Sequence, residues 1–145
     1  MKREDKALGA FIGIMRGSNK LEKIVKQDVT CYGLNMTEFS VMELLFHQGE
    51  QATQHIKEKI LIASSSTTYV IDQLEKKGYV IRSVSPKDKR MTYVSLSEQG
   101  KSLMAEIFPL HAKTISACFS SLEDDELTQL IKLLGKVNRR LDKEI

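Results

Sequence analysis

The chain has 145 residues, with 22 Lys and Arg against 19 Asp and Glu, so its formal net charge at pH 7 is +3. This length allows one domain with a modest hydrophobic core. No apolar run approaches the roughly 18 residues that a membrane-spanning helix needs, and the charged segment 2–6 replaces the apolar stretch of a signal peptide. We therefore expect a cytoplasmic protein that has no membrane partner.

Two helices are expected before residue 50. The first spans about residues 5–30, although three glycines weaken it, and the second runs from a Thr37 cap to about Gly49. The apolar residues of the first recur mostly at three- and four-residue spacing, which is typical of an amphipathic helix: Leu8, Phe11, Ile12, Met15, Leu21, Ile24 and Val25.

The next two expected helices are short and follow each other closely. The first covers about residues 53–60, and the second covers about 64–77 and stops at Gly78. On a helical wheel, the outward N-terminal half of the second helix is small, polar and almost uncharged, which suits the major groove of DNA. Taken alone, the Ser and Thr run at 64–68 is more typical of a capped turn.

A basic hairpin follows at once. Residues 79–84 are rich in β-branched side chains and residues 91–96 alternate apolar and polar, so both segments are expected to be strands around the turn 85–90. Between Lys76 and Lys101 the net charge is +5, more than that of the whole chain. This concentration of cations indicates a local phosphate-binding surface.

Two long helices complete the pattern. Ser97 is expected to begin one that continues through Phe119 with a bend at Pro109, and Ser121 is expected to begin the other, which has an acidic first turn. The terminal helices carry more apolar surface than a small core absorbs. We expect them to pair with the same helices of a second copy, although periodicity alone also allows them to cap their own domain.

Four segments resemble those of one known family. The runs 77–82, 86–90 and 96–101, together with the approach to the second helix at 32–41, resemble the MarR (multiple antibiotic resistance regulator) family of winged-helix transcription factors over essentially the whole chain. The resemblance implies a mainly α fold with a small antiparallel β-hairpin, namely a winged helix-turn-helix lobe at about 34–100 with dimerisation helices at about 1–31 and 101–145. Together these form a single domain, 1–145.

The resemblance also implies how the protein binds double-stranded DNA. The helix at 64–77 would enter the major groove, and Arg90 would enter the minor groove with Asp88 as its support. Family members often carry an Arg where this chain has Lys87, which lacks the planar fork. The expected DNA-binding residues are Ser64, Ser65, Ser66, Thr68, Tyr69, Gln73, Lys76, Lys87, Asp88, Lys89 and Arg90.

The segments 33–49 and 106–111 look most like the branch of the family that responds to quinones and related aromatic compounds. We therefore expect a homodimeric repressor that a small aromatic or phenolic effector, or thiol modification at Cys31, releases from a palindromic operator. The expected effector-lining residues, which as a Met and aromatic stripe are also typical of plain core, are Phe11, Met15, Phe39, Met42, Phe46 and His111.

Other function classes have little support in the sequence. The three histidines have no metal-ligand spacing, and no nucleophile elbow or phosphate-binding Gly loop is present, so we expect no metal, no cofactor and no enzyme activity. A winged helix that binds protein without operator specificity is the alternative. The cations of residues 76–101 argue against it.

Overall fold

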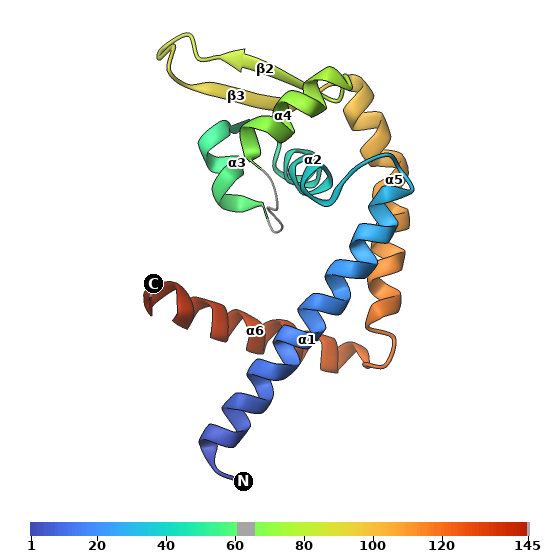
Figure 1. Ribbon diagram of the computed structural model, residues 1–145, viewed down its shortest axis with the longest axis vertical. Coiled ribbons are helices and arrows are strands. Elements are labelled where there is room, and N and C mark those ends of the chain that lie inside the picture. Colours follow the sequence, from blue (N-terminus) through green and yellow to red (C-terminus); the bar gives the residue numbers. More distant parts are fainter. Residues whose placement is uncertain (61–65, 145) are drawn as a thin grey trace. The chain divides into compact units, whose positions relative to one another are not determined.

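A computed structural model describes residues 1–60 and 66–144 (Figure 1). The chain divides into two compact units, Met1–His111 and Ala112–Ile145, and one helix, α5, runs from the first into the second. Each unit is described by itself below. The fold class is mainly helical with a small antiparallel sheet, as predicted.

The first two helices lie where the sequence placed them. Helix α1 spans Arg3–Thr30 without a break at its glycines, and α2 spans Met36–Gln48. The predicted cap of α2 is wrong, because Asn35 takes that position instead of Thr37. The Asn35 Oδ1 atom accepts the Glu38 N–H at 2.8 Å, and Glu38 Oε1 accepts the Asn35 N–H at 2.9 Å. These reciprocal bonds satisfy two backbone donors that the first turn leaves free.

The helix-turn-helix consists of α3, Thr53–Lys59, and α4, Thr67–Lys76. Thr53 does not cap α3, because its hydroxyl donates to the Thr92 carbonyl at 2.8 Å. The predicted start of α4 at Ser64 lies outside the described residues. Its predicted stop is confirmed: Gly78 has φ of 82°, and the Tyr79 N–H donates to the Leu74 carbonyl at 3.0 Å. A positive φ at this position favours glycine.

The sheet holds one more strand than the hairpin predicted from sequence. Strands β2, Val80–Val84, and β3, Thr92–Leu96, are antiparallel, and β1, Gln51–Ala52, pairs with the other side of β3. A strand of two residues is too short to show an alternating pattern, so β1 was not predicted.

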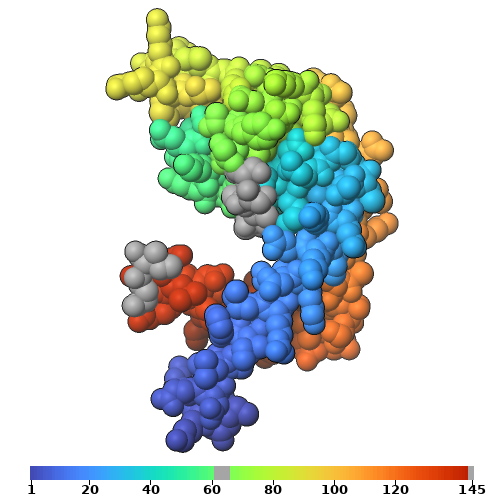
Figure 2. All heavy atoms as spheres, in the orientation of Figure 1, coloured from blue at the N-terminus to red at the C-terminus, as the bar shows by residue number. Residues whose placement is uncertain are grey.

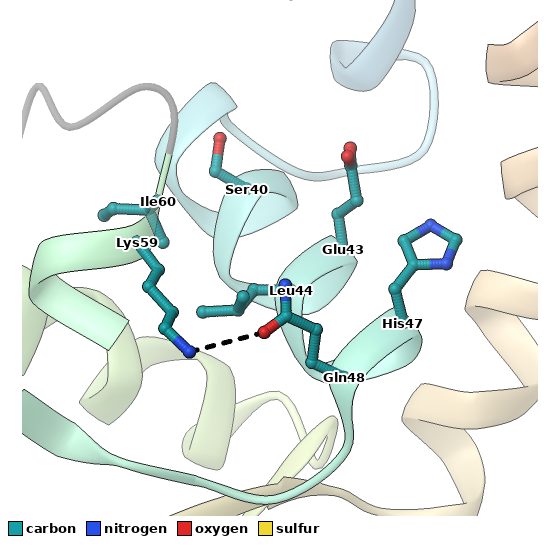
Figure 3. Close-up of a pocket in the computed structure, with 7 residues that line it drawn as sticks. All are labelled: Ser40, Glu43, Leu44, His47, Gln48, Lys59 and Ile60. Atoms are coloured by element: carbon teal, nitrogen blue, oxygen red, sulfur yellow. Dashed lines mark hydrogen bonds between the residues drawn. The ribbon is translucent and has the colours of Figure 1, made fainter. Parts of the chain in front are cut away.

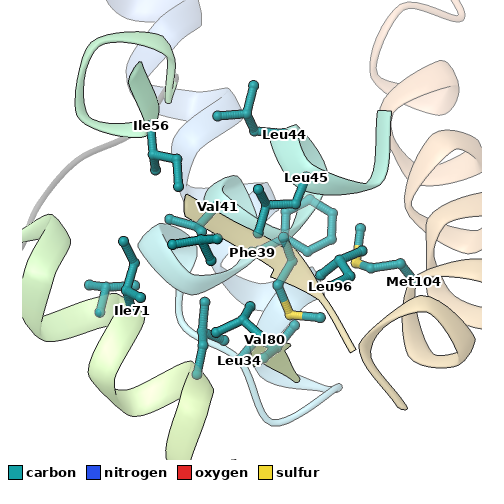
Figure 4. Close-up of a cluster of buried hydrophobic side chains, with 14 of the residues drawn as sticks. Leu34, Phe39, Val41, Leu44, Leu45, Ile56, Ile71, Val80, Leu96 and Met104 are labelled. Atoms are coloured by element: carbon teal, nitrogen blue, oxygen red, sulfur yellow. The ribbon is translucent and has the colours of Figure 1, made fainter. Parts of the chain in front are cut away.

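Helix α2 lies at the centre of the hydrophobic core of the first unit (Figure 4). It packs against α1, α3, α4 and β3, which explains why most of its surface is buried. The fully or nearly fully buried core side chains come from every element of the lobe and include Val41, Met42, Leu45, Ile56, Val70, Ile71, Leu74, Val94 and Met104.

Helix α5, Glu98–Cys118, begins at the predicted Ser97. The Ser97 hydroxyl accepts the Gly100 N–H at 3.0 Å and donates to the Gly78 carbonyl at 2.6 Å. It therefore joins the start of α5 to the turn that ends α4. Gly100 is buried, and a side chain there would run into the Tyr79 carbonyl oxygen.

In the second unit, α6 spans Asp124–Glu144. It begins later than the predicted Ser121, because the Glu126 side chain accepts the Glu123 N–H at 2.9 Å and closes the first turn there. Several apolar side chains of this helix are between 43% and 71% exposed, namely Ile131, Leu133, Val137 and Leu141.

The close approach at Gly100 leads to a stability prediction. We expect Gly100→Ala to lower the free energy of unfolding by about 2 kcal/mol or more, because backbone must move to admit the methyl group. Urea denaturation measures the change. Ser102→Ala, an exposed site in the same helix, is the matched control and should change stability by less than about 0.5 kcal/mol. Equal stability of both variants would contradict the contact.

Candidate nucleic-acid interface

Helix α4 has a buried side and an exposed side. Thr67, Val70, Ile71 and Leu74 are buried, whereas Thr68 and Lys76 are exposed, Tyr69 is 59% exposed and Gln73 is half-buried. Ser66 stands just before the helix and is exposed, with no capping hydrogen bond from its side chain. The exposed side therefore carries five of the predicted DNA-binding residues, while Ser64 and Ser65 lie outside the described residues.

The turn between β2 and β3, residues 85–91, is held by its own hydrogen bonds. The Ser85 N–H donates to the Met91 carbonyl at 2.9 Å, and Ser85 Oγ accepts the N–H groups of Lys87 at 3.2 Å and Asp88 at 3.4 Å. Ser85 thus supplies the acceptor that shapes the turn, two residues before Lys87, where family members often carry an Arg. We call residues 85–91 the wing tip; Figure 2 shows it projecting from the surface around it.

The predicted support of Arg90 by Asp88 is present in the wing tip. Asp88 Oδ1 accepts the Arg90 N–H at 3.0 Å and lies 3.4 Å from Arg90 Nε. The Arg90 side chain is nevertheless 93% exposed, so most of its guanidinium is free to contact a ligand. Lys87 and Lys89 are exposed beside it.

One residue of this interface was missed by the sequence analysis. Arg82, on β2, lies 2.5 Å from Asp72 and 3.1 Å from Glu75, both on α4. Arg82 is one of the cations of the basic segment 76–101, but nothing in the linear spacing indicates its pairing with Asp72 and Glu75. It depends on how β2 lies against α4.

The six predicted effector-lining residues occupy three different settings. Phe39 and Met42 are core residues, whereas Phe11 and Met15 are 59% and 48% exposed on α1. Phe46 and His111 both lie 6.0 Å, centroid to centroid, from the ring of Phe108, a residue that the prediction omitted.

A polar contact joins α1 to α5 beside these rings. His111 Nδ1 lies 2.8 Å from Asp28 Oδ2, and both side chains are almost buried. The pKa of the Tyr32 phenol is raised by burial and by the neighbouring Asp28 carboxylate. The end of α1 is thus fixed to α5 by a buried charged or polar pair.

A small hollow of about 180 Å³ lies between α2 and α3 (Figure 3). Glu43 and His47 line it from α2, and Lys59 lines it from α3, where its ammonium donates to the Gln48 side chain at 3.5 Å. The hollow is mixed in character, with Leu44 and Ile60 among its apolar walls.

Both cysteines are free thiols. Cys31 is exposed and its Sγ lies 3.5 Å from the Gln27 carbonyl oxygen, while Cys118 is half-buried in the second unit. Across residues 1–60 and 66–144, no three His, Cys, Asp or Glu side chains gather as a metal site would require. No helix in the same residues is long and apolar enough to cross a membrane.

Together, α3, α4 and the three-stranded sheet form a winged helix-turn-helix. Residues 34–92 match the model of the MarR family. The chain is 41% identical over 133 residues to the HTH-type transcriptional regulator MhqR of Bacillus subtilis (strain 168), covering 92% of each chain. The chain belongs to the MarR family, and it is a DNA-binding transcriptional regulator, not an enzyme.

Solved structures confirm the fold. A cysteine-to-serine mutant of Escherichia coli MarR, complexed with operator DNA, aligns with a TM-score of 0.79 at 20% identity, over 94% of this chain and 99% of that one. Bordetella bronchiseptica BpsR, in a structure concerned with regulation of DNA binding by 6-hydroxynicotinic acid, aligns with a TM-score of 0.78 at 23% identity, over 91% and 98%.

The wing-tip geometry leads to a prediction about local order. Asp88→Ala removes the acceptor of the Arg90 N–H, so we expect that amide to exchange with solvent at least several-fold faster. Hydrogen exchange followed by NMR measures it. The amide of Val94, inside β3, serves as the internal control and should keep its protection. Unchanged exchange at Arg90 would show that Asp88 does not order the wing tip.

Proposed function

We propose that this protein is a homodimeric repressor that binds a palindromic operator through α4 and the wing tip. The observation that carries the proposal is the pairing, within one compact unit, of an exposed polar helix face with an exposed arginine that a carboxylate braces. Polar side chains suit base edges in the major groove, and an exposed guanidinium suits a phosphate or the minor groove.

The residues divide into two groups by the contact they would make. Thr68, Tyr69 and Gln73 on α4, and Ser66 just before it, would contact bases or nearby phosphates. Ser64 and Ser65, predicted for the same role, lie outside the described residues. Lys76, Lys87, Lys89 and Arg90 supply positive charge, and Asp88 acts through Arg90. Charge contacts strengthen binding to any duplex, whereas base contacts distinguish sequences.

Exposed apolar side chains on α1 and α6 support a dimer. On α1, Phe11 and Leu8 are 59% and 58% exposed, and Ile131 on α6 is 71% exposed. Burying such side chains against a second copy removes apolar surface from water. A two-fold dimer would set two copies of α4 about 34 Å apart, which matches successive major grooves. Residues 1–31 and 101–145 would then serve as dimerisation helices of one MarR-like domain.

We further propose release by a small aromatic or phenolic effector, or by modification of Cys31. Similarity to MhqR and to BpsR, whose DNA binding is described with 6-hydroxynicotinic acid, supports the effector. Two places offer contacts to such an effector. Aromatic contacts come from the rings of Phe46, Phe108 and His111, and polar contacts come from the hollow beside His47. An effector must bind the released state more tightly than the DNA-bound state.

A winged helix that binds protein remains the second candidate. The cationic wing tip disfavours it, since a protein-binding wing has no general need for Lys87, Lys89 and Arg90 at its most exposed point.

Operator binding is tested with duplex DNA from the region upstream of the protein's own gene. We expect a band shift with preference over random duplex of the same length, and weaker binding as salt rises, because phosphate contacts release counterions. Absence of any preference would contradict operator specificity and favour the protein-binding module.

The role of the wing tip is tested with Arg90→Ala. We expect about tenfold weaker operator binding and a salt slope shallower by about one, because one cation no longer meets DNA. Fluorescence anisotropy over a salt series measures both, and size-exclusion chromatography checks that assembly is unchanged. Lys132→Gln, which removes one exposed cation from α6, controls for net charge. Equal affinity of the two variants would exclude contact by Arg90.

A further inference from the structure

We propose that Arg82 is a positioning residue for DNA binding, which acts through Asp72 and Glu75 by neutralising these two carboxylates of α4. This inference deepens the proposed function, because it rests on α4 facing DNA. Arg82 itself is not among the residues expected to contact DNA.

The Arg82 guanidinium contacts two carboxylates at once, one through each terminal nitrogen. Arg82 Nη2 lies 2.5 Å from Asp72 Oδ1, and Nη1 lies 3.1 Å from Glu75 Oε1. The Arg82 side chain is 25% exposed, against 46% for each carboxylate, so it is more buried than the two acids it contacts. Both of its terminal nitrogens are engaged with α4.

The two carboxylates lie on the exposed side of the recognition helix. Thr68, Asp72 and Glu75 are spaced by four and three residues, so they share one row along α4, beside the row of Tyr69, Gln73 and Lys76. A carboxylate in line with Thr68 repels the phosphates that this face approaches. Without Arg82, the two acids would leave this side of α4 with a net negative charge.

Neighbouring lysines do not replace Arg82. The Lys77 ammonium lies 2.7 Å from Glu38 and 3.2 Å from the Gly33 carbonyl, so it is committed to α2. Lys76 is in the other row of α4 and is exposed. A lysine at position 82 would present one point charge where the guanidinium spans two acids.

The test separates charge neutralisation from packing. We expect Arg82→Gln to weaken binding to both operator and random duplex by about tenfold at low salt, because both carry the same phosphates. Restoring neutrality with Asp72→Asn and Glu75→Gln in the same chain should return affinity to within about threefold of the original protein. Fluorescence anisotropy measures affinity, and thermal unfolding with size-exclusion chromatography confirms that each variant is folded and assembled. Lys132→Gln controls for loss of one cation elsewhere.

Two results would overturn the proposal. Unchanged affinity of Arg82→Gln for both duplexes would show that the carboxylates do not oppose DNA. Binding that stays weak in the folded triple variant would show that Arg82 acts by packing or by touching phosphate itself. The two proposals can fail separately, because random duplex is measured as well. If the unmodified protein does not prefer the operator, the repressor function is contradicted. The affinities of the Arg82→Gln and triple variants for random duplex would still test the role of Arg82.

Discussion

The position of helix α4 depends strongly on one buried carboxylate, that of Glu38. Glu38 is 4% exposed, and it both caps the start of α2 and pairs with Lys77 at the end of α4. Lys77 also donates to Gly33, in the connection that leaves α1. Three elements therefore meet at one charged contact. A buried carboxylate that lost its cation would stay desolvated and unpaired, so this contact strongly disfavours other positions of α4.

A second junction fixes the wing to the same helix. The turn at Gly78 ends α4. The Ser97 hydroxyl donates a hydrogen bond to the Gly78 carbonyl, and the same hydroxyl caps α5. Gly100 allows the Tyr79 backbone to approach α5 closely. These contacts directly join the end of α4, the start of β2 and the start of α5. Little relative movement is therefore left between α4 and the wing.

Sequence reasoning recovered the features that local chemistry determines. The Gly78 stop and the Ser97 start follow from residues close together in the chain, and both are present in the structure. The contact of Asp88 with Arg90, which the family resemblance implied, is present as well. The cap of α2 was wrong because Asn35 and Thr37 are both good caps, and the Glu38 that selects Asn35 is three residues away.

The pairs of Glu38 with Lys77 and of Arg82 with Asp72 were missed because tertiary packing brings them together. Periodicity also did not separate core residues such as Phe39 from exposed ones such as Phe11, since both fit an apolar stripe.

The two parts that we propose face DNA differ in how they are held, and this difference bears on the roles they would have. Helix α4 is attached by its buried side, by Lys77 and by Arg82, so its exposed face has a defined position. The wing tip is held by bonds within residues 85–91, and Arg90 extends from it 93% exposed. Base recognition needs side chains placed to within hydrogen-bond geometry, which favours the rigid helix. Charge attraction tolerates movement, so a locally braced arginine can follow the backbone or groove of different duplexes. Under the proposed mode of binding, sequence preference would therefore belong mainly to α4, and salt-sensitive affinity mainly to the wing.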